Sequence, residues 1–417
     1  MELLHEARRI APRYGEIRRR IHRHPEPAYE EVKTAGLVAE TLQGLGIPAG
    51  TGIAKTGVMG RIDGRAPGRC VLLRADMDAL RKEEAVSETE RPHRSKVPGV
   101  MHACGHDGHV AVLLGAAELL KSRAERFEGT VKLVFQPAEE GGRGGLRMVE
   151  EGVLEDPKVG AAFALHAWPE LPCGVAGFQY GTLMAASADF VVEILGRSGH
   201  AAFPHQCVDP VPAAAQLVSA LQTIRSREVG PLEGSVVSVT VLETGSKTVP
   251  GSGPGEDALR PSQTNIIPQL VRLRGTSRSL SLEGQEHQLK RIREIAEAVA
   301  SAHGARATFA IGKDYPPTTN DRAMTDLARG AALVALGEEN VVWLEEPTMG
   351  GEDFSYFLQR VPGSFIHLGT ARGDTPEALR EEPALHADRF DFNDDALPAG
   401  MALMASIALA FLESPRG

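Results

Sequence analysis

Residues 101–121 have the sequence MHACGHDGHVAVLLGAAELLK, in which a cluster of histidines leads into a run rich in alanine and leucine. That run predicts a helix. Short apolar stretches at 71–73 and 130–135 flank it, and their length favours strands. Another buried strand is predicted at 161–165. Alternating strands and helices are typical of a mostly parallel α/β sheet covered on both faces, whose reactive groups gather where the strands end.

The pattern changes near residue 186. A half-exposed strand, a long helix at 210–227, further strands and a helix at 282–303 predict an α+β unit with an antiparallel, ferredoxin-like sheet. After the prolines at 316 and 317, the alternation of helices and short strands seen before residue 186 resumes. We therefore expect residues 186–313 to form a domain inserted into a larger α/β domain.

The larger domain is expected to comprise residues 1–185 and 314–417. Within the insert, the glycines and prolines of residues 248–262 predict a loop.

The composition of the chain excludes several classes of protein. Its 417 residues contain 45 Lys and Arg against 55 Asp and Glu, a net charge of -10, which excludes a basic nucleic-acid-binding surface. The charged N-terminus lacks the pattern of a secretory signal, and the most apolar stretch, 401–412, is too short to span a bilayer and predicts a core helix. We expect a soluble, cytoplasmic protein whose four cysteines are reduced.

The densest group of reactive side chains is the segment from His102 to His109, with three histidines, a cysteine and an aspartate. Burying these groups is costly unless they bind a metal or one another. A structural zinc site is the alternative, but the second CxxC or HxxxH pair that usually completes one is missing. The HExxH helix of thermolysin-like enzymes is also missing. Further ligands must therefore come from elsewhere in the chain.

The predicted strand ends supply these ligands. Asp76 and Asp78 follow one strand, Glu139 and Glu140 follow the next, and His166 follows a third. Each residue alone could be an ordinary loop residue, but parallel strands would deliver all of them to one crevice. Adjacent glutamates point in different directions, so one can bind metal while the other faces a substrate. This layout is typical of a metal hydrolase.

Several motifs resemble those of the dinuclear-metal aminoacylase and carboxypeptidase family: RADMDAL, MHACGHDGH, QPAEEGG, HAW, GRSGHAAFPH, TNIIP, GGEDF and LHADRFDFND. The most similar branch contains hippurate hydrolases, indole-acetyl-amino-acid hydrolases, N-acetyl-diaminopimelate deacetylases and bacterial carboxypeptidases. The resemblance covers about nine tenths of the chain, in family order. It implies a catalytic α/β domain interrupted by a lid and dimerisation domain.

The resemblance also implies a ligand set for two divalent ions and a general base. Glu139 falls on the base, and the metal ligands fall on Cys104, His106, Glu140, His166 and His386. Mixed thiolate, imidazole and carboxylate ligands suit zinc, manganese, cobalt or nickel better than calcium or magnesium.

Other residues near the ligands receive supporting roles. Asp78 matches the family aspartate that orients a ligand, and Asp107 could support His106. Asp76 stands where relatives outside the branch have a ligand histidine, and a turn-capping role is the alternative. We expect hydrogen-bonding or packing roles for His102 and His109.

The resemblance places further site residues in the insert. His200 matches a histidine that reaches the active site of a partner subunit and stabilises the oxyanion, which implies a homodimer or higher homo-oligomer. Asn265 and Arg278 match positions that hold the substrate carboxylate, the alternatives being a strand-end amide and a solvated arginine. Near the predicted metals, Glu352 and Asp353 are expected to support the ligands.

The sequence therefore predicts a metal-dependent amidohydrolase that cleaves N-acyl-L-amino acids, with Glu139 as the base. A carboxypeptidase acting on short peptides shares this chemistry and is the close alternative. A non-catalytic metal-binding or peptide-binding homologue is the alternative from another class. Two departures from the branch could alter substrate choice: Arg81 replaces a usual proline, and the stretch before Thr264 is longer than usual.

Overall fold

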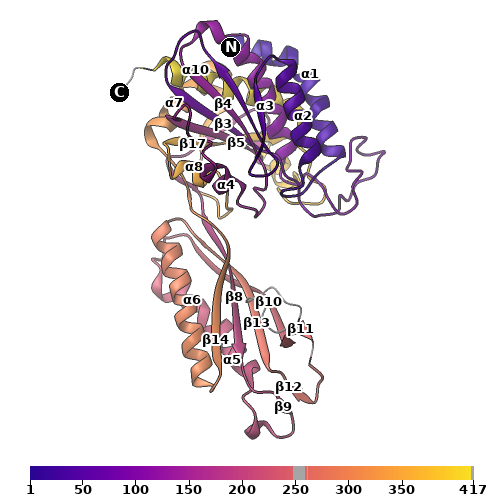
Figure 1. The fold of residues 1–417 in the computed structure, drawn as a ribbon, viewed down its shortest axis with the longest axis vertical. Coiled ribbons are helices and arrows are strands. Elements are labelled where there is room, and N and C mark those ends of the chain that lie inside the picture. The colour runs from indigo at the N-terminus through magenta and orange to yellow at the C-terminus, as the bar shows by residue number, and fades with distance from the viewer. Residues whose placement is uncertain (248–258, 261, 415–417) are drawn as a thin grey trace. The chain divides into compact units, whose positions relative to one another are not determined.

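The computed structural model describes all residues except 248–258, 261 and 415–417 (Figure 1). It divides into two compact units, which we describe separately. Unit 1 contains Met1–Leu183, Thr318–Glu346 and Asp353–Gly417, and unit 2 contains Met184–Pro317 and Pro347–Glu352.

Unit 1 is built on an eight-stranded sheet whose four central strands, β4, β3, β5 and β17, are mutually parallel. Two strands at one edge pair antiparallel with their neighbours, as does β17 with β6. In order across the sheet, the strands are β1 (Ala49–Ile53), β2 (Gly57–Asp63), β4 (Thr130–Gln136), β3 (Cys70–Asp76), β5 (Ala161–Pro172), β17 (Gly363–Ala371), β6 (Ala176–Phe178) and β16 (Val341–Trp343). A separate pair joins β7 (Gly181–Met184) to β15 (Thr318–Asn320).

Helices cover both faces of this sheet. In the sheet, β4 and β5 lie on opposite sides of β3, so the connection from β3 to β4 and the connection from β4 to β5 cross the sheet in opposite directions. Because such connections are right-handed, their helices α3 and α4 lie on opposite faces. The helices of unit 1 are α1 (Glu2–Arg23), α2 (Val32–Gly44), α3 (His106–Lys121), α4 (Gly144–Glu150), α7 (Arg322–Leu336), α8 (Ser355–Leu358), α9 (Pro376–Glu381) and α10 (Leu397–Glu413).

The core of unit 1 lies where α3 and α10 pack on the central strands. Both helices are apolar nearly all round, which is typical of buried helices. The segment Asp394–Glu413 is long and apolar enough to cross a membrane, but 67% of its apolar window is buried in the structure. Since α10 contacts α1, α3 and α7, it is the core helix that the sequence predicts.

Unit 2 has the order strand, helix, two strands, helix, strand, and its sheet is antiparallel throughout. Two helices pack on one face of the sheet. The elements are β8 (Ala186–Leu195), α5 (Pro210–Thr223), β10 (Ser235–Lys247), β11 (Leu259–Arg260), β13 (Leu270–Ser279), α6 (Leu282–Ala302) and β14 (Arg306–Tyr315), with a small pair of β9 (Gly199–His200) and β12 (Ile266–Ile267). The predicted fold class is confirmed: a mostly parallel α/β domain interrupted by an antiparallel α+β unit.

Three local features differ from the sequence predictions or fall outside the structure. The predicted helix 210–227 is α5 followed by a π-helical segment, Ile224–Glu228. The strand predicted at 161–165 continues to Pro172. In the loop predicted at 248–262, residues 248–258 and 261 lie outside the described residues, and Leu259–Arg260 pair with β10.

Two glycine-to-alanine substitutions test the packing of unit 1. A Cβ on Gly108 of α3 would lie 2.2 Å from the ring of buried Phe392, whereas a Cβ on exposed Gly36 of α2 would meet nothing within 4 Å. We expect Gly108→Ala to lower stability by about 1–3 kcal/mol through overpacking. Gly36→Ala should raise stability by about 0.4–1 kcal/mol, because alanine restricts the unfolded chain. Melting temperatures that shift in the same direction for both variants would contradict the packing described here.

Candidate functional site

The candidate site lies at the carboxyl edge of the central strands of unit 1. Asp76 is the last residue of β3, and Glu139 and Glu140 come three and four residues after β4 ends. His166 lies within β5, and His106 begins α3. Parallel pairing of β4, β3 and β5 therefore brings residues from distant parts of the sequence to one edge.

The carboxylate of Asp78 fixes the glutamate pair. Its Oδ1 accepts a hydrogen bond from the backbone N–H of Glu139 at 3.0 Å, and its Oδ2 accepts one from Glu140 at 2.9 Å. The carbonyl oxygen of Asp78 also lies 2.9 Å from Nδ1 of His106. Through these contacts, one buried aspartate sets the position of three predicted site residues.

Candidate ligand atoms converge around Cys104. Its Sγ lies 3.4 Å from Nε2 of His166 and 3.3 Å from Nε2 of His386, and the latter atom lies 3.1 Å from Oε1 of Glu140. Potential ligand atoms lie within 4.8 Å of one another in three overlapping groups of these residues: Cys104, His106 and His166; Cys104, Glu140 and His386; and His106, Glu139 and Glu140. The structure therefore brings all five sequence-predicted ligands and Glu139 together.

The chemistry of these residues fits divalent metal ions. Nε2 of His106 is buried and has no hydrogen-bond partner, although the ring is fully enclosed. Burial opposes the charged form of this imidazole, but Asp76 and Asp78 dominate and raise the pKa of His106 to about 10. Burial, with Glu140 and Glu139, likewise holds the pKa of the Cys104 thiol well above its usual value. Buried carboxylates beside an imidazole nitrogen that makes no hydrogen bond within the described structure form an environment that cations stabilise.

The contacts of His109 and His102 differ from those of the histidines that are predicted ligands. Nδ1 of His109 lies 2.6 Å from Oδ1 of Asp76, and its Nε2 accepts a hydrogen bond from the backbone of Ala167 at 2.8 Å. Both of its nitrogens are therefore engaged. His102 is buried with neither ring nitrogen hydrogen-bonded, and burial lowers its pKa to about 4.

A buried polar cluster under the glutamates was not found from the sequence. Arg74 donates to Oδ2 of Asp76 at 2.7 Å and to Oδ1 of Asp353 at 3.0 Å, and Gln136 donates to Asp353 at 2.6 Å. Asp76 therefore belongs to a buried ion pair with Arg74 and also contacts His109. The backbone N–H of Asp353 lies 3.4 Å from Oε1 of Glu139. A charged residue inside the apolar strand CVLLRAD was the signal for this cluster.

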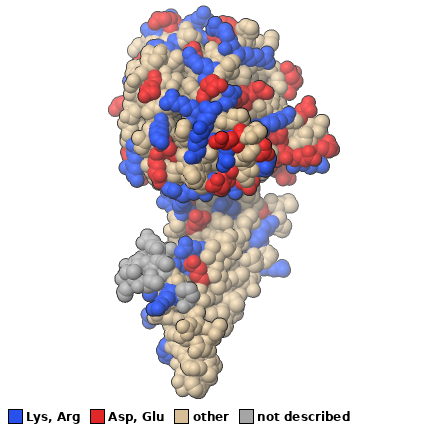
Figure 2. Space-filling view, turned by 90° about the vertical axis from the view of Figure 1, so that its right-hand side faces the viewer, with Lys and Arg blue, Asp and Glu red and all other residues tan. Residues whose placement is uncertain are grey.

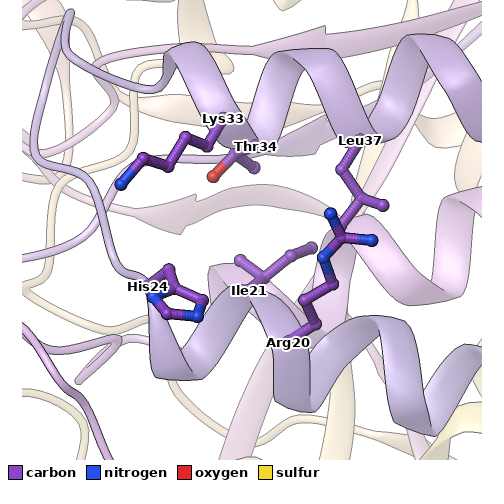
Figure 3. Close-up of a pocket in the computed structure, with 6 residues that line it drawn as sticks. All are labelled: Arg20, Ile21, His24, Lys33, Thr34 and Leu37. Carbon is purple, nitrogen blue, oxygen red and sulfur yellow. The ribbon is translucent and has the colours of Figure 1, made fainter.

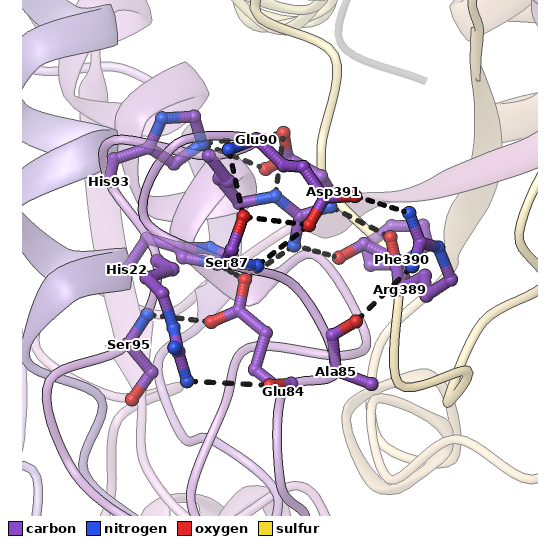
Figure 4. A network of polar contacts seen from close by, with 12 residues as sticks. His22, Glu84, Ala85, Ser87, Glu90, His93, Ser95, Arg389, Phe390 and Asp391 are labelled. Carbon is purple, nitrogen blue, oxygen red and sulfur yellow. Dashed lines mark hydrogen bonds and ion pairs between the residues drawn. The ribbon is translucent and has the colours of Figure 1, made fainter.

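A second buried network, which the sequence also did not reveal, includes Asp107 at the start of α3, and Figure 4 shows the part of it around His22, Glu84 and Asp391. Oδ2 of Asp107 lies 2.8 Å from Nδ1 of His22 and 3.3 Å from Nη1 of Arg18. Nε2 of His22 lies 3.3 Å from Glu84, and Arg18 also donates to Asp391 at 2.8 Å. Arg18 and His22 stand four residues apart on the buried face of a helix rich in exposed arginine, which was the available signal.

In unit 2, the structure brings His200 and Asn265 together. β9 pairs with β12, and the backbone N–H of Ala201 donates to the carbonyl of Asn265 at 3.0 Å. Both predicted residues are exposed. They lie next to the start of β13, whereas Arg278 is near its end, roughly 25 Å away at 3.3 Å per residue. Arg278 is half-buried and donates to the carbonyl of Ser277 at 3.0 Å, and burial lowers its pKa.

A cavity of about 320 Å³ lies between the end of α1 and the start of α2 (Figure 3). It is lined by Arg20, Ile21, His24, Lys33, Thr34 and Leu37. None of these is a predicted site residue, so the cavity is separate from the group around Cys104.

Comparisons with known proteins agree with this geometry. The model of "Peptidase family M20/M25/M40" matches residues 72–410. The chain is 41% identical over 401 residues to IAA-amino acid hydrolase ILR1-like 4 of Arabidopsis thaliana, which covers 95% of this chain and 85% of that protein. It is also 36% identical over 414 residues to Thermostable carboxypeptidase 1 of Saccharolobus solfataricus, and this alignment covers 98% of this chain and 98% of that protein.

A solved structure shows the same fold. The YXEP protein of Bacillus subtilis, described as a dinuclear metal binding peptidase from the M20 family, matches with a TM-score of 0.78 and 32% identity. The match covers 97% of this chain and 99% of that chain.

The network behind α3 predicts a pH-dependent contribution to stability from His22. Burial disfavours its charged form, but Asp107 and Glu84 dominate and raise its pKa to about 9. A raised histidine pKa adds stability that is complete below the unfolded value near 6.5 and is lost as the pH rises through about 9. We expect His22→Gln to lower the unfolding free energy by on the order of 2–3 kcal/mol at about pH 6, and by less at about pH 9.5.

Thermal melting at both pH values would measure this difference. Exposed His5, on the same helix, provides the control variant His5→Gln, which should change little at either pH. A deficit for His22→Gln that is independent of pH would contradict a charged imidazole in the native protein.

Proposed function

Because the chain belongs to peptidase family M20/M25/M40 and is therefore a hydrolase, we propose that it cleaves the amide bond of N-acyl-L-amino acids in a metal-dependent reaction. The observation that carries this proposal is the convergence of Glu139 with the thiol, imidazole and carboxylate groups around Cys104. The names of two relatives, an IAA-amino acid hydrolase and a carboxypeptidase, support amide hydrolysis as the reaction type.

In this proposal, two divalent ions are held by the five residues Cys104, His106, Glu140, His166 and His386. Zinc, manganese, cobalt or nickel suits these donors. When bound, such ions polarise a carbonyl group and make water a better acid. The name of the dinuclear metal-binding relative supports a pair of ions.

Glu139 is proposed to be the general base. Its side chain is buried, its backbone is fixed by Asp78, and its Oε1 lies near the backbone N–H of Asp353. The backbone N–H of Glu140 also donates to Asp78, so the backbone of both glutamates is fixed. In the proposal, one carboxylate serves as the base and the other as a metal ligand. Glu139 takes the proton of the attacking water and passes it to the departing amine.

Unit 2 is proposed to complete the site from a second subunit. His200, which is exposed on β9, would donate a hydrogen bond to the oxyanion, and Asn265 beside it would bind the substrate carboxylate. Because Arg278 lies roughly 25 Å away along β13, it would have to contact the same carboxylate from the other subunit of the pair. The described surface of unit 2 also exposes large apolar side chains, and Figure 2 shows few charged groups over its lower part. These side chains include Phe203, Val241, Leu242, Ile266 and Ile311. Such a surface supports a homodimer or higher homo-oligomer.

A carboxypeptidase acting on short peptides is the second candidate, and the similarity to Thermostable carboxypeptidase 1 favours it. A non-catalytic homologue is disfavoured because the ligands and Glu139 are all present. We also propose a cytoplasmic location, which is supported by four cysteines that form no disulfide in the described structure.

Glu139→Gln separates catalysis from metal binding. The amide cannot accept a proton, so we expect kcat to fall roughly 10²- to 10⁴-fold while the metal content stays unchanged. The assay uses metal-loaded protein with benzoyl-, acetyl- and indole-acetyl-amino acids and with dipeptides. The relative rates on acyl amino acids and dipeptides decide between the two candidate functions.

The matched control is Glu150→Gln, an exposed glutamate on α4 that should leave turnover unchanged. Full turnover by Glu139→Gln would overturn the role of this residue. Failure of the metal-loaded wild-type protein to hydrolyse any substrate of the set would overturn the proposed function.

Mixing two inactive variants tests the shared site. Glu139→Gln and His200→Ala should each be inactive alone, but a mixed dimer contains one site in which both residues are intact. Random exchange at equal amounts should therefore restore about a quarter of wild-type activity. Sedimentation would verify that the protein is a dimer. A fully active monomer, or a mixture as inactive as its components, would contradict this proposal.

A further inference from the structure

His386 is held differently from the other proposed ligands. It lies between α9 and the terminal helix in a segment without helix or strand, and its φ of 65° is unusual for a residue with a side chain. Its ring is 53% exposed. The position of this ring therefore depends on the contacts that hold its segment.

The guanidinium of Arg91 supplies two of those contacts. Nη1 donates to the carbonyl oxygen of Phe390 at 2.9 Å, and Nη2 donates to that of Arg389 at 2.8 Å. The backbone N–H of Ala85 also donates to the carbonyl of Asp388 at 2.9 Å. The loop that contains residues 84–95 thus donates hydrogen bonds to the backbone carbonyls of residues 388, 389 and 390, which follow His386 (Figure 4).

Arg91 is itself fixed by a buried carboxylate. Its side chain is 10% exposed, and its Nη1 lies 2.5 Å from Oε1 of Glu84, which is 1% exposed. The other oxygen of Glu84 accepts a hydrogen bond from the backbone of Ser95 at 2.6 Å. Because a guanidinium is planar, a carboxylate that fixes it also fixes the direction of both carbonyl bonds.

The contacts continue from Glu84 to the start of α3. Oε1 of Glu84 lies 3.3 Å from His22, whose other nitrogen lies 2.8 Å from Asp107, the residue after His106. The network therefore begins at Asp107, the residue after the proposed ligand His106, and ends on the backbone three and four residues after the proposed ligand His386. Ion pairs buried in this way add little net stability, and fixing a particular geometry is a use that can retain them.

We propose that Arg91 is a positioning residue that holds His386 in place for one metal ion of the pair. This inference rests on the proposed function, because it requires that His386 binds metal. Among the described residues, Arg91 contacts no proposed ligand side chain, and it acts through the backbone of residues 389 and 390.

Replacing Arg91 with methionine keeps most of the apolar part of the side chain and removes the guanidinium that donates to both carbonyls. We expect Arg91→Met to weaken the binding of one metal ion about 10- to 100-fold, a typical effect of removing a supporting partner. The other ion, held by ligands on α3 and β5, should bind as in the wild type. Arg91→Lys should not restore binding, because one ammonium cannot reproduce the planar fork to both carbonyls.

The experiment is a titration of metal-free protein with Mn²⁺ or Zn²⁺, followed by calorimetry and by metal analysis after dialysis. It compares wild type, Arg91→Met, His386→Ala and the double variant. If Arg91 acts through His386, both single variants weaken the same ion, and the double variant is no weaker than His386→Ala. A role in general stability would instead give additive losses for both ions.

Arg94→Met is the matched control, because Arg94 lies on the same loop but contacts Glu83 and the backbone of Glu84 rather than the His386 segment. Binding of both ions by Arg91→Met with wild-type affinity would overturn the inference, as would equal loss of both. Wild-type protein that binds no metal would overturn the proposed function itself. If Arg91→Met does not fold, the same comparison with Arg91→Lys decides the question.

Discussion

The carboxylate of Asp78 accepts hydrogen bonds from two successive backbone amides, and most of the site depends on this contact. It joins the end of β3 to the end of β4, and its own carbonyl oxygen meets His106 at the start of α3. A short acidic side chain can reach these groups only because parallel pairing brings the strand ends to one edge. The fold and the chemistry of the site are thus linked through one buried aspartate.

Charge balance explains why so many ionisable groups lie inside unit 1. Around Cys104, the carboxylates of Glu139 and Glu140 lie close to thiol and imidazole groups, an arrangement that suits cations. Behind α3, Arg18 and the imidazole of His22 oppose Asp107, and the pKa of Asp107 is strongly lowered although burial alone would raise it. The first region therefore has the groups that a metal ion would need, whereas in the second region the protein itself supplies the opposite charges. This difference decides which buried histidine and carboxylate groups are available as ligands.

The sequence was sufficient for the fold class and for the residues that converge at the strand ends, because strand ends and motif residues are local features. It did not reveal the partners of those residues. Arg74 and Gln136 meet Asp353 across more than 200 positions, and Arg91 meets residues 389 and 390 across almost 300. Such contacts depend on how β3, β4 and distant loops pack, so no spacing in the sequence records them. For Arg278, likewise, the sequence could not indicate its distance from His200 along β13.

Unit 2 enters the chain on β8 and leaves it on β14, and these two strands are neighbours, with Ser187 opposite Tyr315. The two ends of the segment Met184–Pro317 therefore lie next to each other, and this segment has its own apolar core, while the short segment Pro347–Glu352 also belongs to unit 2. Recombination at these two adjacent points could exchange most of unit 2 as one piece. The surface of unit 2 could then diversify in evolution while the strand order of unit 1 stays the same.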